Sequence, residues 1–249
     1  QPGSSFKPYV YAVALEKGLR PQSTVVDSPV RLGKWSPQNY GRSFRGRVTA
    51  TEALVRSINT IPVKLSLKYG RTPIVEKAYE MGVQSSLRPN PSIALGTNEI
   101  TVLDQVTGYG VFARGGLEAG RHGIIQILSR DGLLLYDHNR DAPEPKQVLS
   151  EDAARGMNEM LVQVTQWVTA RRAALAGIAA AGKTGATQAY RDAWFVGYTG
   201  NYVAAVWYGN DNFTPTRRLT GGRLPAMTWQ QFMTYAHQNV GLKPIPLIT

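Results

Sequence analysis

A serine and a lysine stand three residues apart near the start of the sequence, at Ser4 and Lys7. The stretch 9–15 after them is apolar without a break, and Gly18 then provides a helix stop. Because a helix that is apolar on all sides is a buried one, we expect Ser4 and Lys7 on one face of the first turn of a buried helix. Burying a hydroxyl and an amine costs free energy unless each has a partner or a function. The alternative is that Ser4 caps the helix and Lys7 is a solvated charge.

The chemistry open to this pair is nucleophilic catalysis. A serine hydroxyl is a poor nucleophile without a base, and the three histidines, His122, His138 and His237, lie far apart in the sequence. The adjacent amine of Lys7 is then the candidate base. The pKa of a free lysine is about 10.4 and would have to fall by roughly 3 units for the amine to accept a proton near neutral pH. Burial and a second cation nearby both lower it, and Lys183 could be that cation.

The composition is that of a globular protein, with 249 residues, 43% hydrophobic and 18% charged. One large domain, or one domain with a lobe, is expected. The net charge of +11 could attract an anionic polymer, lipid or nucleic acid. The basic residues are scattered, however, and no recognition motif is present, so no nucleic-acid partner is predicted. The absence of cysteine and the wide spacing of the histidines predict no metal site, and no cofactor is expected.

The first half of the sequence predicts short helices with short connections, as in an all-helical lobe. Segment 19–47 reads as loop with a possible short strand at 24–26, and its part 33–47 places aromatic residues between charges. That part could contact a polymer, although we favour an ordinary solvated loop. Capping residues, prolines and glycines then delimit the helices, which are expected at 49–59, 63–69, 73–81 and 101–115.

The second half of the sequence predicts mainly strands. A hairpin is expected on the Asp131-Gly132 turn, followed by a proline-rich connector at 137–148 and a long helix from Ser150 to about Val168. A terminal sheet and a closing helix are then expected at 178–185, 194–198, 202–208 and 224–238, with Met227, Trp229, Phe232 and Tyr235 available to pack the helix on the sheet.

One motif in this sequence resembles a dinucleotide-binding site but does not fit one. Residues 108–113 match G-x-G-x-x-A, and Asp131 follows at about the right distance for a dinucleotide-binding site. Such a site requires a strand before the first glycine. A helical period runs through the segment instead, so we reject this interpretation.

Three short polar signatures stand in order along the chain: Ser4-x-x-Lys7, Ser57-x-Asn59 and Lys183-Thr184-Gly185. Each is weak alone, but together they resemble the motif set of penicillin-binding proteins and class A β-lactamases. Flanking residues extend the likeness over nearly the whole chain and match the transpeptidase domain of class A penicillin-binding proteins best. They lie at 1–8, 94–99, 181–185, 191–199 and 220–225.

The resemblance implies an α/β (α+β) fold of the penicillin-binding-protein and serine β-lactamase type, in which helices and an all-helical lobe flank an antiparallel sheet. Residues 1–249 would form one penicillin-binding transpeptidase domain without its upstream strands. The chain starts at Gln1 without an initiator Met, so we expect a fragment whose glycosyltransferase domain and membrane anchor lie upstream. The location implied is the extracytoplasmic face of the bacterial cytoplasmic membrane, the periplasm in a Gram-negative cell, with divisome or elongation proteins as possible partners.

The function implied by the resemblance is a peptidoglycan D,D-transpeptidase that is inhibited covalently by β-lactams. Ser4 would attack the donor stem peptide, Lys7 would take its proton, and Ser57 would relay a proton towards Lys183 and the leaving amine. A neighbouring stem peptide would then release the acyl group. We see no equivalent of the deacylating glutamate of class A β-lactamases, so the penicillin adduct should persist.

The resemblance also implies the substrate-binding residues. Asn59 would hold the amide side chain of the peptide, and Lys183 and Thr184 would bind the terminal carboxylate of D-Ala-D-Ala. The backbone N–H groups of Ser4 and Ala186 would form the oxyanion hole. The binding strand would continue through Gly185, Ala186 and Thr187.

The sequence departs from the family at position 186. The usual K-T-G-T-T is here Lys183-Thr-Gly-Ala186-Thr187, so a hydroxyl expected on the substrate carboxylate is missing. The backbone donor remains. We expect catalysis to survive and carboxylate binding to weaken by about 1 kcal/mol, the value of one hydrogen bond.

Other functions stay open on the sequence alone. A D,D-carboxypeptidase or a β-lactamase would use water as the acceptor, and a β-lactam sensor domain would form the adduct without cross-linking. Retention of Ser4, Lys7 and Lys183 argues against a silent wall-binding module.

Overall fold

The central element of the fold is helix α1 (Lys7–Glu16), whose residues 7 to 15 are all buried. The computed structural model describes residues 1–167 and 170–248. A 3₁₀ turn, η1 (Gly3–Phe6), precedes α1 and carries Ser4. The expected first α-helical turn is therefore a tighter turn. Because a 3₁₀ helix has three residues per turn, residues i and i+3 still lie above one another.

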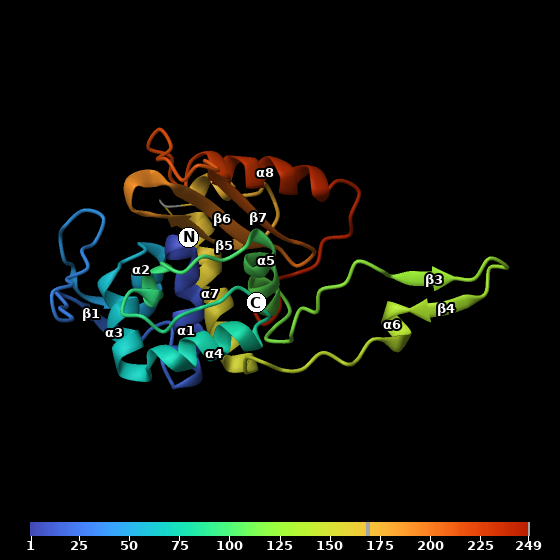
Figure 1. The fold of residues 1–249 in the computed structure, drawn as a ribbon, viewed down its shortest axis with the longest axis horizontal. Helices are drawn as coiled ribbons and strands as arrows, with labels where there is room; N and C mark the ends of the chain where they lie inside the picture. Colours follow the sequence, from blue (N-terminus) through green and yellow to red (C-terminus); the bar gives the residue numbers. More distant parts are fainter. Residues whose placement is uncertain (168–169, 249) are drawn as a thin grey trace.

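A three-stranded antiparallel sheet lies beside α1, with the strands in the order β5 (Ala181–Ala186), β6 (Asp192–Tyr198) and β7 (Val203–Gly209). Lys183 pairs with Val196 and Ala186 with Ala193. Every residue of β6 is buried. Helix α8 (Leu224–Ala236) packs on β6 and β7, and helix α5 (Val102–Ala113) contacts the same two strands (Figure 1). The expected antiparallel sheet with flanking helices is confirmed.

Helix α8 packs on the sheet through one face only. Trp229 is buried and packs against Phe195 with ring centroids 5.1 Å apart. The expectation that Met227, Phe232 and Tyr235 also pack on the sheet is wrong, because these side chains are at least 43% exposed. The helical period places the contact face on Ala226, Trp229 and Met233 instead.

The helical lobe consists of α2 (Ala50–Val55), α3 (Thr60–Tyr69), α4 (Arg71–Glu80), and the start of α5, with the long helix α7 (Glu151–Gln166) alongside α1. Its connections differ from the prediction. Helix α2 ends at Val55 rather than near residue 59, and α3 starts at Thr60 because Pro62 is tolerated in a first turn. The expected end of α7 at Val168 lies outside the described residues.

A short two-stranded sheet completes the lobe, formed by β1 (Thr24–Asp27) and β2 (Gly46–Thr49). The expected strand at 24–26 is confirmed. The prediction of loop up to residue 47 is wrong for β2, whose short polar sequence gains its strand geometry from pairing with β1. The loop between them is tied down by Asp27, which accepts hydrogen bonds from Thr60 Oγ1 at 2.6 Å and from Asn39 Nδ2 at 3.0 Å.

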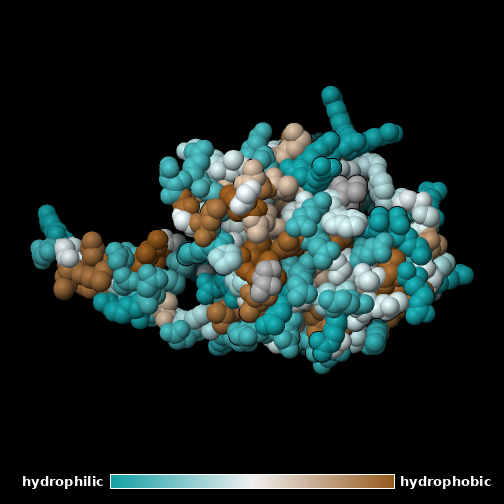
Figure 2. Space-filling model, turned by 180° about the vertical axis from the view of Figure 1, so that it is seen from behind, coloured by the Kyte–Doolittle hydropathy of each residue, from teal (hydrophilic) through white to brown (hydrophobic). Residues whose placement is uncertain are grey.

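An arm, residues 118–146, projects from the body (Figure 1). It contains the expected hairpin, β3 (Gln126–Leu128) and β4 (Leu134–Asp137), and a helical turn, α6 (His138–Asp141), within the predicted connector. The space-filling view shows apolar side chains along it (Figure 2). Seven aliphatic side chains there are each at least 37% exposed, namely Ile124, Ile125, Ile127, Leu128, Leu133, Leu134 and Leu135.

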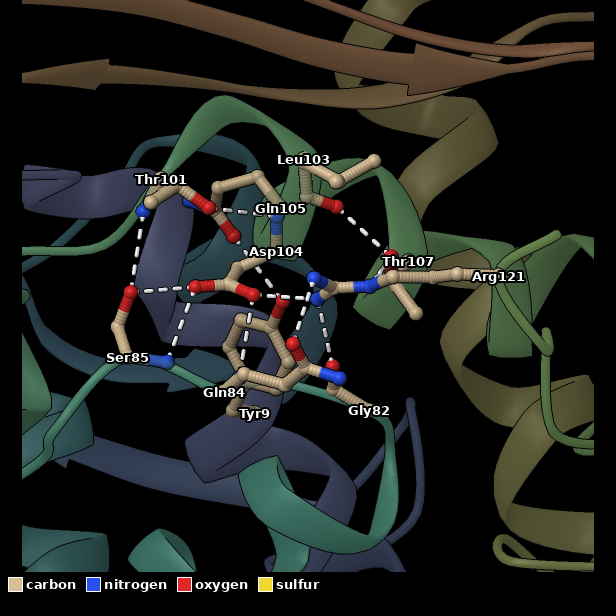
Figure 3. A network of polar contacts seen from close by, with 10 residues as sticks. All are labelled: Tyr9, Gly82, Gln84, Ser85, Thr101, Leu103, Asp104, Gln105, Thr107 and Arg121. Carbon is tan, nitrogen blue, oxygen red and sulfur yellow. Dashed lines mark hydrogen bonds and ion pairs between the residues drawn. The ribbon is translucent and has the colours of Figure 1, made fainter. Parts of the chain in front are cut away.

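The base of the arm is fixed to the body by Arg121. Its guanidinium forms an ion pair with the buried Asp104 of α5 and donates to Thr107 Oγ1 at 2.8 Å and to the carbonyl of Gly82 at 2.7 Å (Figure 3). Burial would raise the pKa of Asp104, but hydrogen bonds from Ser85 and Arg121 outweigh it and hold that pKa below its usual range. The arm is thus anchored by a largely buried charge.

The same helix α5 also contacts the catalytic end of α1. Tyr9 donates to Gln105 Oε1 at 3.0 Å, and Gln105 donates to Ser5 Oγ at 2.8 Å. Gly108 makes this packing possible, since a Cβ there would lie 2.1 Å from the Tyr9 hydroxyl. The glycines of the rejected dinucleotide motif therefore lie inside a helix, and the first of them leaves room for the side chain of Tyr9.

No helix among the described residues is both long and apolar enough to cross a bilayer.

Candidate active site

A cleft of about 1820 Å³ lies between the helical lobe and the sheet. It is lined by Ser4 from η1, by Ser57 and Asn59 from the α2–α3 connection, and by Thr184 from β5. The fold therefore brings the three signatures of the sequence to one place. Two lysines belonging to these signatures, Lys7 and Lys183, lie directly behind them and are fully buried.

The two buried lysines share one hydroxyl group. Ser57 Oγ accepts a hydrogen bond from Lys7 Nζ at 3.2 Å and another from Lys183 Nζ at 3.0 Å. At an effective dielectric constant of about 20, two unit charges roughly 6 Å apart repel each other by about 3 kcal/mol. Full protonation of both amines is therefore costly.

Lys7 has three further oxygen neighbours. Its Nζ lies 2.6 Å from the carbonyl oxygen of Ser57, 2.7 Å from Asn59 Oδ1 and 3.2 Å from the carbonyl oxygen of Ile58, so its N–H groups are shared among four acceptors that include Ser57 Oγ. These oxygens stabilise the ammonium. Loss of solvent and repulsion from Lys183 outweigh them, and the pKa of Lys7 lies well below 10.5. Burial alone lowers the pKa of Lys183 to about 7.

The loop that presents these oxygens is strained and supported from outside. Ser57 has φ +56°, a left-handed conformation that costs a non-glycine residue about 1 kcal/mol or more. Asn59 is held by the β1–β2 loop, because its N–H donates to Asn39 Oδ1 at 2.9 Å and its Nδ2 to the carbonyl of Gln38 at 2.7 Å. The loop therefore fixes the acceptors around Lys7.

Ser4 lies in the cleft but is not bonded to Lys7 in this state. Within the described part of the chain, no hydrogen bond to the Ser4 hydroxyl is present. Its backbone position is fixed by close packing, because a Cβ on the preceding Gly3 would lie 2.5 Å from the carbonyl oxygen of Ala186. The turn thus sits against the end of β5. Catalytic hydrogen bonds are often long in unliganded enzymes and tighten only with substrate.

The remaining predicted site residues lie in β5 or directly after it. Thr184 Oγ1 is 3.5 Å from Lys183 Nζ, and Ala186 is exposed to the cleft. The hydroxyl of Thr187 accepts from the N–H of Asp192 at 2.9 Å and donates to Asp192 Oδ2 at 3.1 Å. It is therefore engaged in the turn after β5 and does not replace the hydroxyl missing at position 186.

Several cleft residues were not singled out from the sequence. Trp35, Tyr40 and Arg42 belong to the loop that we favoured as ordinary and solvated, and they line the cleft together with Tyr190. Tyr190 forms a side-chain hydrogen bond with Tyr40 and so raises the pKa of the Tyr40 phenol. The aromatic residues between charges were the signal that could have identified this loop.

No group of three or more residues suited to holding a metal ion is found in the described ranges. His122 and His138 nevertheless meet, with stacked rings 3.5 Å apart at the base of the arm hairpin, and His237 is bonded to Thr199 Oγ1. None of the three histidines lines the cleft. The buried lysines are thus its candidate bases.

Comparison with known proteins gives consistent matches. A family model, the penicillin binding protein transpeptidase domain, matches residues 1–221. Penicillin-binding protein 1A of Aquifex aeolicus is 37% identical over 256 residues, which cover 98% of this chain and 35% of the relative. The protein of the same name from Neisseria meningitidis is 35% identical over 261 residues, with coverages of 98% and 32%. The chain spans about a third of the length of these relatives.

Solved structures match as well. The PonA1 protein of Mycobacterium tuberculosis in complex with penicillin V superimposes with a TM-score of 0.90 at 27% identity, covering 99% of this chain and 71% of that one. Penicillin-Binding Protein 1A of Haemophilus influenzae gives a TM-score of 0.83 at 25% identity, with coverages of 99% and 44%. The similarity extends over the whole described fold.

The lowered pKa of Lys183 predicts how stability depends on pH. The unfolded chain keeps this proton up to about pH 10.5, whereas the folded protein loses it near pH 7. The unfolded state therefore binds more protons between these values, and the free energy of unfolding should rise with pH by about 1.4 kcal/mol per unit for this group. Denaturant titrations between about pH 7.5 and 9.5 measure the free energy of unfolding at each pH. Plotted against pH, this free energy should rise less steeply for Lys183→Met than for the wild-type protein. The control Lys34→Met, at an exposed loop position, should keep the wild-type slope, and equal slopes in all three proteins would contradict the prediction.

Proposed function

Because the chain belongs to the penicillin-binding protein transpeptidase family, we propose that it is a serine D,D-transpeptidase that cross-links peptidoglycan stem peptides and is acylated by β-lactams. The observation that carries the proposal is the Ser57 hydroxyl held between two buried lysines of lowered pKa. A neutral amine beside a serine is what this chemistry needs when no histidine is available. The penicillin V bound to the related PonA1 protein supports the choice of inhibitor.

In the acylation step, Ser4 Oγ attacks the carbonyl carbon of the penultimate D-alanine while Lys7 accepts the hydroxyl proton. The new Oγ–C bond forms a tetrahedral intermediate. The C–N bond to the terminal D-alanine then breaks, and Ser57 donates a proton to the leaving nitrogen and is reprotonated from the lysines.

In the deacylation step, the amine of a second stem peptide attacks the ester carbon. Its proton passes to Lys7, the N–C bond forms, and the Oγ–C bond breaks as Lys7 returns the proton to Ser4 Oγ. Attack by water instead would give the D,D-carboxypeptidase reaction, in which the same groups act on a different acceptor.

Substrate binding is assigned to β5 and the facing loop. Lys183 and Thr184 bind the terminal carboxylate, and Asn59 binds the amide side chain of the peptide. The substrate lies along residues 184 to 187, which line the cleft. The N–H groups of Ser4 and Ala186 bind the oxyanion, which the close packing of η1 on the end of β5 favours.

The rest of the protein is proposed from its relatives. Residues 1–249 form one transpeptidase domain of a longer protein that also carries a glycosyltransferase domain and a membrane anchor, a proposal supported by the greater length of the penicillin-binding protein 1A relatives. The domain then acts at the extracytoplasmic face of the cytoplasmic membrane. Proteins of cell division or elongation are its partners there.

Penicillin acylation tests the function directly. Intact mass spectrometry should show one penicillin adduct on the wild-type protein, and peptide mapping should place it on Ser4. The adduct should persist for hours, because no deacylating carboxylate was identified. The Ser4→Ala variant should give no adduct, whereas Ser5→Ala, at the adjacent buried hydroxyl, should keep it. Rapid loss of the adduct would indicate a β-lactamase, and labelling of Ser4→Ala would exclude the proposed nucleophile.

The departure at position 186 predicts a gain of function. Ala186 is exposed to the cleft, so Ala186→Thr should add a hydrogen bond to the carboxylate of the substrate or β-lactam. The second-order acylation rate should rise about five-fold, equivalent to about 1 kcal/mol. The matched change Ala176→Thr, at an exposed position that does not line the cleft, should have no effect. An unchanged rate for Ala186→Thr would refute the expectation.

A further inference from the structure

The cleft is lined by many more positive than negative side chains. Its charged lining residues are one aspartate, Asp192, and six arginines, namely Arg42, Arg56, Arg171, Arg172, Arg191 and Arg223. Among the described residues only Arg56 of these six forms an ion pair with a carboxylate, that of Glu52 at 2.7 Å. Six of the 28 lysine and arginine residues, drawn from separate parts of the sequence, thus line the proposed active site.

Asp192 does not neutralise this surface. It is 5% exposed, and its oxygens already accept hydrogen bonds from Trp207 Nε1 at 3.0 Å and from Thr187 Oγ1 at 3.1 Å. The carboxylate is therefore engaged in the turn between β5 and β6. The arginines face the cleft without a negative partner on the sheet side.

Two of the arginines lie beside the end of the substrate-binding strand. Arg191 immediately precedes β6, whose Ala193 pairs with Ala186, and its guanidinium carbon lies 4.6 Å from the ring centroid of Phe213. This cation–π contact restrains an otherwise exposed side chain. Arg191 is therefore held near the strand end.

Arg223 is placed by an unusually close packing contact. Gly221 lies against β5, since a Cβ on it would be 2.6 Å from the carbonyl oxygen of Gly185. Arg223 follows two residues later and immediately precedes helix α8, whose N-terminal dipole adds to its positive charge. The dipole and the guanidinium together favour an anion at this point.

We propose that this cleft selects donor peptides that carry a free carboxylate in addition to the terminal one, and that Arg191 and Arg223 bind that extra carboxylate. The inference rests on the proposed transpeptidase function, which assigns the terminal carboxylate to Lys183 and Thr184. Guanidinium groups bind carboxylates through paired N–H donors. An amide at the same position of the peptide accepts fewer such bonds and carries no charge.

The experiment compares two donor pentapeptides, N-acetyl-L-Ala-γ-D-Glu-L-Lys-D-Ala-D-Ala with its free α-carboxylate, and the same peptide with that carboxylate amidated. Release of D-alanine gives kcat/KM for each. The wild-type protein should prefer the free carboxylate by about five-fold, as one exposed ion pair allows. The preference should decrease at high salt, because the arginines are exposed.

The double variant Arg191→Gln/Arg223→Gln should abolish the preference. The control is Arg217→Gln, which removes the same charge from an exposed residue that does not line the cleft, and it should retain the preference. Circular dichroism checks folding, and the two single variants, each expected to reduce the preference, replace the double variant if it is unfolded.

The outcomes separate the two proposals. Equal turnover of both peptides by the wild type overturns the inference while the transpeptidase function stands. Equal preference in the arginine variants and in Arg217→Gln overturns the assignment to Arg191 and Arg223. Failure to release D-alanine from either peptide, together with no acylation by penicillin, refutes the function itself.

Discussion

The structure depends on one interaction, the hydroxyl of Ser57 between two lysines that have no access to water. Burying one ammonium is costly, and burying two that share an oxygen is more so. The fold maintains this arrangement by surrounding Lys7 with fixed oxygens at residues 57–59 and by burying residues 7–15 of α1. The same cost lowers the pKa values of both amines. Burial of the two lysines thus both lowers their pKa values and costs the folded protein free energy.

The remaining architecture positions the partners of this interaction. Glycines allow η1 to lie against the end of β5, and the β1–β2 loop supports Asn59 from the other side. On the far side of α1, Gln105 links Tyr9 to Ser5, and its neighbour Asp104 holds the arm through Arg121 (Figure 3). The residues next to Ser4 and Lys7 are therefore fixed by packing and hydrogen bonds, while the cleft side of the turn stays open.

Much of this could be predicted from the sequence. The apolar stretch 9–15 predicted the buried helix, the three signatures marked the residues that the cleft brings together, and the resemblance to class A penicillin-binding proteins is confirmed by the comparisons. What could not be predicted depends on long-range contacts. Strand β2 forms only through pairing with β1, and the cationic lining arises because arginines distant in sequence converge on one cleft. The detail that Lys7 is bonded to the loop rather than to Ser4 has no sequence signal at all.

The central claim is that burial and the charge of Lys183 lower the pKa of the Lys7 amine well below its ordinary value. An NMR titration of isotope-labelled lysine side chains, with the Lys7 signal assigned through Lys7→Met, measures this directly. The account predicts that Lys7 titrates far below pH 10.5 in the wild-type protein, and that Lys183→Met raises its pKa because the repelling charge is gone. An ordinary lysine titration for Lys7, indifferent to Lys183, would contradict the account.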